Sequence, residues 1–344
     1  MKYREALALA MQTAMSEHKK TMIIGQGVTD FKGIFGTVTG LAEDYPNRVI
    51  ETPLAEDSIM GVCIGAALNG MYPINTHIRA DFSLLVFNQL INLAAKYRYM
   101  FGGLFETPLM LRLVIGRSWG QGAQHSQSLQ SLLAHIPGLM VLMPATSGSI
   151  LRSYRHAIEI HRGPIVMLEH RLMYELEFED DENIPDDPFG SRIDCYGTDV
   201  TIVACSVMLL EARRAARHLN EQGISVEIID LHSASHPDQE MIFNSVAKTG
   251  RVLVADTSWV QYGVCAEISR IICERSPSVL KAPIKSLGMA HAPCPTAKAL
   301  EDMFYPDVHD ISVAVCDLLG VALDARHPEK QSMTDFYKHF KGPF

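Results

Sequence analysis

Short apolar segments alternate with amphipathic segments along most of this 344-residue chain. Residues 109–115, 165–169 and 200–204 are mainly apolar, and stretches with helical periodicity, such as 209–221, stand between segments of this kind. Apolar strands separated by helices are typical of parallel sheets that are covered by helices on both faces. The sequence therefore predicts an α/β fold in which each sheet is mostly parallel.

The alternation is interrupted once, at residues 175–192. This stretch is rich in Asp and Glu, contains two prolines and has no period, which is typical of a linker. A chain of this length most naturally forms two domains. We therefore expect a first domain at 1–174, a linker at 175–192, a second domain at 193–325 and a tail at 326–344. The tail mixes charged and aromatic residues, and is either a frayed end or a strap that docks on another subunit.

Composition narrows the classes of partner and compartment. The formal charge of −9 disfavours a nucleic-acid partner. The seven cysteines include no C-x-x-C pair, which favours reduced thiols in a cytosolic protein. No apolar run reaches the roughly 18 residues of a membrane span, and Met1 leads directly into a predicted helix. We expect a cytoplasmic protein without a membrane or nucleic-acid partner.

The segment 51–70 holds the first candidate site. Glu56 stands just before a predicted helix of small residues, which Asp57 or Ser58 can cap and which ends at Asn69-Gly70. Burial among apolar groups raises the pKa of a carboxyl group, which suits a proton donor to a cofactor. A carboxylate in this place can instead simply stabilise the helix dipole. The spacing alone leaves both interpretations open.

A second candidate site lies in the glycine-rich loop 116–126, which follows an apolar strand and carries His125. An imidazole in such a loop suits proton transfer near neutral pH, but it can also simply bond to the backbone. Phe82, just past another strand, could offer a ring for stacking or belong to the core. The chain has no P-loop, dinucleotide fingerprint, nucleophile elbow, H-E-x-x-H motif or acidic pair at metal-ligand spacing, so we predict no metal ligands in it. Acid–base candidates without a phosphate motif indicate one half of a shared site.

Several longer stretches identify a family. Residues 51–70 match T-P-[IL]-x-E…G-A-A-x-x-G, residues 94–103 match A-A-K-x-R-Y-M-x-G-G, and residues 122–128 match G-x-Q-H-S-Q-S. Residues 168–174, 197–203, 226–231 and 293–301 match further motifs of the same family. Over residues 3–319 the chain resembles the β subunits of thiamine-diphosphate-dependent 2-oxo acid dehydrogenase E1 components, of the pyruvate, branched-chain and acetoin types.

The resemblance implies a pyrimidine-binding domain followed by a transketolase-type C-terminal domain. It implies an α2β2 heterotetramer, in which the α subunit holds Mg²⁺ and the diphosphate through a motif that is missing here, and a lipoyl-bearing E2 component as a further partner. In this family Glu56 would bond to N1′ of the aminopyrimidine, Phe82 would stack on that ring, and His125 would assist acyl transfer to a lipoyl group. Leu54, beside Glu56, is also expected at the cofactor.

The chain departs from the family at several positions. Residues 25–28 read G-Q-G-V where G-E-[DE]-V is common, and residues 76–80 read T-H-I-R-A where E-F-M-T-F is common. His77 and Arg79 therefore bring polar, potentially cationic groups to the substrate side. Arg79 could bind a carboxylate or phosphate of an unusual substrate, or form an ion pair at the subunit contact. Residues 157–164 are one residue longer than the family segment that often holds K⁺, so we do not expect a K⁺ site.

The leading functional prediction is an E1 β subunit that decarboxylates a 2-oxo acid and passes the acyl group to a lipoyl carrier. The departures favour an alternative with the same cofactor, a two-chain transketolase-like or acyloin-forming carboligase that adds the acyl unit to an aldehyde. A third hypothesis is a catalytically silent subunit that positions a partner. The presence of both Glu56 and His125 counts against it.

Overall fold

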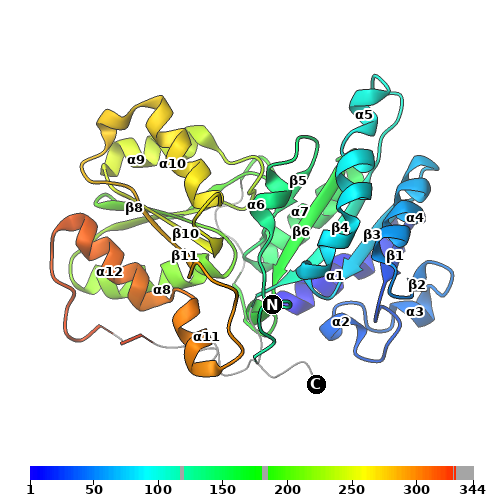
Figure 1. The fold of residues 1–344 in the computed structure, drawn as a ribbon, viewed down its shortest axis with the longest axis horizontal. Coiled ribbons are helices and arrows are strands. Elements are labelled where there is room, and N and C mark those ends of the chain that lie inside the picture. The colour runs from blue at the N-terminus through cyan, green and yellow to red at the C-terminus, as the bar shows by residue number, and fades with distance from the viewer. Residues whose placement is uncertain (117–119, 180–184, 328, 331–344) are drawn as a thin grey trace.

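Two sheets lie side by side in the computed structural model, which describes all residues except 117–119, 180–184, 328 and 331–344 (Figure 1). The first sheet is parallel throughout, with strand order β2-β1-β3-β4-β6-β5. Its strands are β1 (Thr21–Gly25), β2 (Val49–Glu51), β3 (Tyr72–His77), β4 (Leu109–Ile115), β5 (Met140–Leu142) and β6 (Pro164–His170). Its helical segments are α1 (Tyr3–Glu17), α2 (Gly33–Gly36), α3 (Leu41–Asp44), α4 (Glu56–Leu68), η1 (Ala80–Val86), η2 (Asn88–Ala94), α5 (Tyr97–Met100), α6 (Gln130–Ala134), α7 (Ser147–Glu159) and η3 (Arg171–Met173).

The second sheet has the order β11-β10-β8-β9-β7, and only β7 runs antiparallel. Its strands are β7 (Arg192–Cys195), β8 (Val200–Ala204), β9 (Val226–Asp230), β10 (Val252–Trp259) and β11 (Lys285–Met289). The helices around it are α8 (Val207–Glu221), α9 (Gln239–Thr249), α10 (Val264–Arg275), η4 (Pro277–Val279), α11 (Lys298–Phe304) and α12 (Val308–Leu319). Two mostly parallel sheets with flanking helices confirm the predicted fold class.

Strand β4 illustrates why the apolar segments form central strands. Met110 and Val114 belong to one apolar cluster, together with residues of α1 and α7, whereas Leu111 and Leu113 belong to a second cluster, with residues of α4, η2 and α6. Because successive side chains of a strand point to opposite faces, a strand buried on both faces must be apolar at nearly every position. In the second sheet α8 and α12 cover one face, and α9 and α10 the other (Figure 1).

One buried ion pair interrupts this apolar core. Arg112 of β4 donates to both carboxylate oxygens of Glu169 in β6, at 2.6 and 2.8 Å, and both side chains are fully buried. The hydroxyl groups of Tyr154 and Tyr174 donate to the same carboxylate, at 2.5 and 2.8 Å. Burial acts to lower the pKa of Arg112, but the adjacent Glu169 raises it above its usual value. The Glu169 carboxylate thus accepts four hydrogen bonds inside the first half of the chain, while Nη1 of Arg112 is buried without a hydrogen-bond partner among the described residues.

The two sheets are joined by hydrogen bonds at β5. The backbone N–H of Met143 donates to the carbonyl of His232 at 2.8 Å, and that of Ala234 donates to the carbonyl of Val141 at 2.9 Å. The imidazole of His232 also lies 2.8 Å from the hydroxyl of Ser153. The segment that follows β9 thus packs directly against the edge strand of the first sheet.

Several segments could not be anticipated from the sequence. Residues 80–94 form a 3-10 segment followed by a π-helical segment, and the Asp81 carboxylate accepts hydrogen bonds from the backbone and side chain of Gln127 at 3.2 and 2.9 Å. The antiparallel strand β7 and the helix α11 were not predicted. At the start of the predicted linker, the backbone N–H of Tyr3 donates to Leu176, and that of Phe178 donates to Met1.

Most of the predicted tail, and residues 180–184 of the predicted linker, lie outside the described residues. Within the described part, the ring of His327 lies 5.1 Å from that of His218 in α8 and 5.9 Å from that of His309 in α12. All seven cysteines are free thiols, five of them buried. No helix among the described residues has the length and apolar character needed to cross a bilayer.

Candidate active site

The candidate site lies at the end of the first sheet where the carboxyl ends of its parallel strands are found. We call this end of the sheet its carboxyl edge. Strands β2, β1, β3 and β4 are consecutive neighbours in the sheet, so the loops that leave their carboxyl ends meet along one edge. Such an edge is where open parallel sheets bind ligands. A cavity of about 410 Å³ lies there, lined by Gly25, Gln26, Asp30, Lys32, Ile34, Phe35, Thr52, Pro53, Glu56, Ile59, Asn75, Thr76, His77, Ile78, Arg79, Phe82, Gln121 and His125.

Glu56 is the first residue of α4 and is half-buried in the cavity wall. Gln26 Nε2, from the loop after β1, donates to Glu56 Oε1 at 3.3 Å. The residue that precedes α4 is Ala55, which makes no side-chain cap, so the predicted capping by Asp57 or Ser58 is wrong: both lie inside the first turn. The helix therefore begins with two carboxylates that favour its dipole, and Glu56 is the one at the cavity.

The loop that carries Gln26 is held in place by Glu51, the last residue of β2. The Glu51 carboxylate accepts hydrogen bonds from the backbone N–H of Gly27 at 2.6 Å, and from the backbone N–H and hydroxyl of Thr29 at 3.1 and 3.0 Å. At Gly25 a β-carbon would lie 2.5 Å from the carbonyl oxygen of Thr76, so only glycine permits this close approach of β1 to β3. The residues before and after Gln26 are thus both held in place, which fixes the position from which Gln26 reaches Glu56.

Phe82 and His125 form another part of the cavity wall. Their ring centroids are 5.4 Å apart with an edge-on arrangement, and 38% of Phe82 is exposed, which leaves part of its ring for a ligand. The loop of His125 rests on the second half of the chain. Gly120 and Gly122 have φ values of +68° and +71°, and a β-carbon on either would lie under 3 Å from an oxygen of Thr296.

His77 and Arg79 also line the cavity, at and just after the end of β3. Asn75 donates to the carbonyl of Ile24 at 3.1 Å, so its Oδ1 accepts from His77 Nε2 at 3.0 Å. Burial lowers the pKa of His77 to about 4, although Glu56 acts to raise it, so His77 is neutral at neutral pH. The expectation of a cationic group at this position therefore applies to Arg79 alone, since burial lowers the pKa of Arg79 only to about 10.

Five of the six residues singled out from the sequence therefore share one cavity. Leu54 is not among the residues that line it, and 81% of its surface is exposed. Sequence reasoning missed Lys32 and Gln121 as cavity residues. Both stand in glycine-rich loops whose path depends on tertiary packing, so periodicity carried no signal for them. Gln26 and Thr76 also line the cavity. Both stand where the sequence departs from the family pattern, at residues 25–28 and 76–80, and these departures were the signal that could have identified them.

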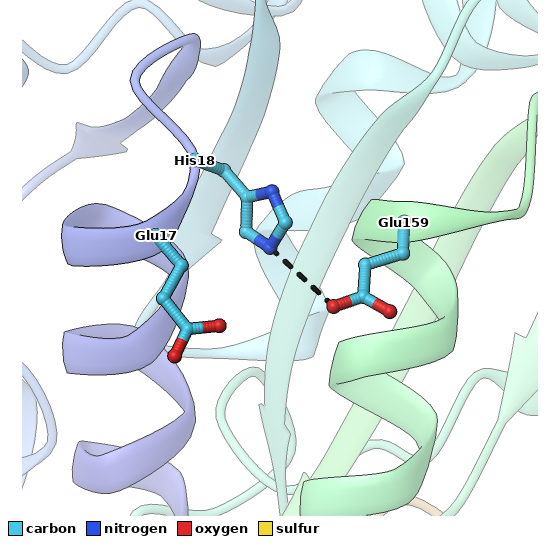
Figure 2. A group of neighbouring side chains, drawn as sticks. All are labelled: Glu17, His18 and Glu159. Carbon is cyan, nitrogen blue, oxygen red and sulfur yellow. Dashed lines mark ion pairs between the residues drawn. The ribbon is translucent and has the colours of Figure 1, made fainter.

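A separate acidic group lies at the other edge of this sheet. Glu17 and His18, at the end of α1, and Glu159, at the end of α7, bring one ligand atom each to within 4.8 Å of one another (Figure 2). His18 Nε2 is 3.7 Å from Glu159 Oε1, and Arg155 also donates to this carboxylate at 3.2 Å. Because these residues precede β1 and β6, they lie at the amino ends of the strands, opposite the cavity. Spacing in the sequence could not reveal this group, because Glu159 is distant from the other two along the chain.

Comparisons with known proteins agree with this architecture. The pattern of the transketolase pyrimidine-binding domain family matches residues 1–177, and that of the transketolase C-terminal domain family matches residues 190–311. In fold, the chain is similar to a chain described as "Split gene transketolase, inactive beta4 tetramer", with a TM-score of 0.77 and 22% identity, over 93% of this chain and 99% of that one.

Relatives with higher identity have named activities. The β subunit of acetoin:2,6-dichlorophenolindophenol oxidoreductase from Cupriavidus necator is 37% identical, over 82% of this chain and 83% of the relative. The pyruvate dehydrogenase E1 component subunit β-1 of Arabidopsis thaliana is also 37% identical, over 90% and 87%. The corresponding β subunit of Rickettsia conorii is 35% identical, over 91% and 96%. The chain therefore belongs to the transketolase-like family that includes the β subunits of the pyruvate dehydrogenase E1 component and of the acetoin oxidoreductases.

Proposed function

We propose that this chain is the β subunit of a thiamine-diphosphate-dependent E1-type enzyme that decarboxylates a 2-oxo acid and transfers the acyl group to a lipoyl carrier. The observation that carries the proposal is the cavity at the carboxyl ends of the strands of the first sheet, to which three separate segments bring Glu56, Phe82 and His125. These are the three residues that the family motifs assign to the cofactor and the acyl group.

The residues in the cavity fit the aminopyrimidine part of thiamine diphosphate. Glu56 offers a carboxylate that can bond to a ring nitrogen, and the partly exposed ring of Phe82 offers a stacking surface. The diphosphate and its Mg²⁺ need other ligands. Among the described residues, the cavity lining has only two carboxylates, Asp30 and Glu56, and the sequence lacks a phosphate-binding loop. We infer that an α subunit supplies these ligands, in an α2β2 assembly.

The outer face of α4 supports a second chain at this site. Gly61 and Gly65 are one turn apart, and a β-carbon on either would meet nothing within 4 Å, so both face outward and would let another helix approach closely. The outer surface of α4, η1 and the segment around α5 also exposes large apolar side chains: Val62, Leu68, Leu84, Leu85, Tyr99, Met100 and Leu104. An exposed apolar surface of this extent is typical of a protein interface.

In this proposal each residue has one task. Glu56, held by Gln26, accepts and returns a proton at N1′ of the bound ring. Thiamine diphosphate supplies the electron sink for decarboxylation. Phe82 fixes the plane of the ring. His125, beside Phe82, exchanges a proton with the acyl group as it passes to the lipoyl carrier. We assign no task to Leu54 and no site to K⁺.

The test is 2-oxo-acid-dependent reduction of a dye by the complex of this chain with its α subunit, with and without thiamine diphosphate and Mg²⁺. We expect cofactor-dependent turnover with one member of a panel of pyruvate, branched-chain 2-oxo acids and 2-oxoglutarate. Replacing Glu56 by Gln should reduce turnover roughly 100-fold or more. The matched control is Glu43→Gln, on the exposed surface of α3. Full turnover by the Glu56→Gln complex would refute the proposed role.

The carboligase hypothesis remains as the alternative, because Arg79 and Lys32 add positive charge to the cavity. Adding an aldehyde acceptor to the same panel separates the two functions. Consumption of a keto donor only when an aldehyde is present, without dye reduction, would favour the carboligase.

A further inference from the structure

A buried carboxylate of the second sheet is hydrogen-bonded to the segment that follows His125. Asp256, in β10, is fully buried, and its Oδ1 accepts from Gln130 Nε2 at 2.8 Å and from the backbone N–H of Thr257 at 2.7 Å. Its Oδ2 accepts from the hydroxyl of Ser258 at 2.6 Å. Gln130 is the first residue of α6, a helix that packs against the first sheet. The bond between Gln130 and Asp256 therefore links the two sheets close to His125.

The thiol of Cys205 is a further donor to the same carboxylate. Cys205 directly follows β8, the neighbour of β10, and its Sγ donates to Asp256 Oδ1 at 2.9 Å. Burial raises the pKa of this thiol well above its usual value, and Asp256 adds to the effect, so the thiol keeps its proton and acts as a donor. A buried carboxylate is costly unless hydrogen bonds compensate it. The donors from the second sheet thus hold Asp256 in the place from which it binds Gln130.

A second contact joins the same two elements. Ser128 Oγ donates to Gln130 Oε1 at 2.7 Å and lies 3.2 Å from Thr257 Oγ1, which also accepts from Gln130 Nε2 at 3.3 Å. All of these side chains are buried, so water cannot readily replace a partner that is lost. We call Ser128, Gln130, Asp256 and Thr257 the inter-sheet network. It fixes residues 128–130 relative to the second sheet.

His125 lies between two contacts with the second half of the chain. Before it, a β-carbon on Gly122 would lie 2.7 Å from Thr296 Oγ1, so the backbone passes very close to that residue. After it, the inter-sheet network holds the segment. One further contact ties the same stretch to the first half, where Asp81 accepts from Gln127. The position of His125 in the cavity thus depends on both halves of the chain.

We propose that Asp256 is a positioning residue for His125, which it holds through Gln130 in the place needed for acyl transfer to the lipoyl carrier. This role rests on the proposed function and adds to it a residue that is not among those lining the cavity. Glu56 is positioned differently, because α4 carries it and Gln26 of the first half donates to it. The second sheet should therefore affect acyl transfer more than decarboxylation.

Two acceptors of the acyl group can distinguish these steps. In transfer to a lipoyl group the disulfide is the oxidant: its S–S bond breaks, one sulfur forms the thioester, and the other takes up a proton. His125 exchanges a proton in this transfer in the proposed function. In the dye assay the dye takes up the two electrons, and the acyl group combines with water and leaves as a carboxylic acid. A displaced His125 should therefore slow acyl transfer to a lipoyl group more than dye reduction.

The test measures kcat with lipoamide and with the dye, for the complex of the full chain with its α subunit and the 2-oxo acid that the wild-type complex uses. The main variant is Gln130→Met, which removes both polar groups of the side chain and keeps its length. We expect its kcat with lipoamide to fall roughly 10-fold or more relative to its kcat with the dye. A ratio of the two kcat values equal to that of the wild type would overturn the inference.

Two substitutions of Asp256 separate the hydrogen bond from general packing. Asp256→Asn keeps an oxygen for Gln130, and its amide nitrogen can donate to the hydroxyl of Ser258, so this variant should retain most of the turnover with lipoamide. Asp256→Leu has a similar size but no acceptor, and it should lower the ratio as Gln130→Met does. A loss in Asp256→Asn as large as that in Asp256→Leu would contradict positioning through this bond.

The matched control is Thr201→Val, in β8. Thr201 is fully buried, and its hydroxyl lies 2.8 Å from the hydroxyl groups of both Ser245 and Thr249. The substitution therefore removes buried hydrogen bonds from the second sheet without touching the inter-sheet network. It should leave the ratio of the two kcat values unchanged. An equal fall of the ratio in Thr201→Val and Gln130→Met would indicate a general structural effect and overturn the inference.

Hydrogen exchange tests the position of the segment without turnover. Backbone amides of residues 121–133 should exchange roughly 10-fold faster in the Gln130→Met complex than in the wild type, whereas those of α4 should be unchanged. If the wild-type complex turns over no 2-oxo acid, the proposed function fails, and exchange decides the inference alone. Exchange also decides it if the wild-type complex reduces the dye but not lipoamide. Unchanged exchange of residues 121–133 would then overturn the inference, and faster exchange would support it.

Discussion

Gln26 Nε2 donates a hydrogen bond to Glu56 Oε1 over 3.3 Å, although Gln26 stands in the loop after β1 and Glu56 begins α4, which follows β2. The contact exists because β1 and β2 are neighbours in the sheet and because Glu51, at the end of β2, holds the loop of Gln26. The amide thus positions the carboxylate that the proposed function places at the cofactor.

The first prediction follows from this contact. Gln26→Leu removes the donor and keeps the approximate size of the side chain, so Glu56 should lose its fixed orientation. We expect kcat of the complex to fall roughly 10-fold, the effect of one hydrogen bond to a charged group. Steady-state dye reduction measures it. The matched control is Gln89→Leu, because Gln89 donates at 2.8 Å to Asp57, the neighbour of Glu56. Equal effects of the two substitutions would contradict a specific role for Gln26.

A second prediction concerns the loop of His125. Gly120→Ala places a β-carbon 2.6 Å from the carbonyl oxygen of Thr296 at a φ of +68°, so the loop must move. Gly223 also has a positive φ, +77°, but a β-carbon there would meet nothing within 4 Å. Gly223→Ala should therefore cost only the strain of a left-handed backbone conformation, about 1–2 kcal/mol. We expect Gly120→Ala to reduce kcat at least 10-fold more than Gly223→Ala. Indistinguishable kcat values would show that the contact with Thr296 does not position His125.

Stability should depend on pH through His77. Its pKa is near 4 in the folded chain and about 6.5 when unfolded, so the unfolded state binds more protons between these values. The free energy of unfolding should therefore decrease as the pH falls from 7.5 to 4.5, with about 2 kcal/mol of the loss due to His77. Urea titrations at the two pH values should show a smaller loss for His77→Gln than for wild type. His135→Gln, at an exposed position, should retain the wild-type loss, and a retained loss in His77→Gln as well would count against this assignment.

The buried pair of Arg112 and Glu169 yields a fourth prediction. Glu169→Gln leaves the guanidinium of Arg112 uncompensated in the core, which should cost about 3–5 kcal/mol of unfolding free energy. The double variant Arg112→Met/Glu169→Gln removes that charge and retains an acceptor for the tyrosine hydroxyl groups. It should therefore be more stable than the single variant. Urea titration at pH 7.5 measures both, and a double variant that is less stable than Glu169→Gln would contradict the argument.

Much of the fold was predictable because burial on both faces forces the central strands to be apolar. The strands at Leu109–Ile115 and Val200–Ala204 have the predicted bounds for this reason. Strand β7 was not predicted, since an antiparallel edge strand that contains Arg192 and Asp194 has no such requirement. The change from 3-10 to π-helical turns after Ala80 also leaves no periodic signal in the sequence.

The site was predictable only where the sequence carried a motif. The stretches around Glu56 and His125 are specific, and the structure places both residues at one cavity; their chemical roles remain predictions. Lys32 was missed, because the path of its loop depends on contacts that no local pattern encodes. The neutral state of His77 depends on its burial, which lowers its pKa, so its sequence neighbours could not reveal it.

The cavity is lined mainly by residues that follow the strands, while the strands themselves hold the core. Side chains such as Lys32 and Gln26 can therefore be exchanged at little cost to the packing of the sheet. A chain built in this way can acquire a new substrate through a few loop substitutions, and related chains with the same scaffold can differ in what they consume.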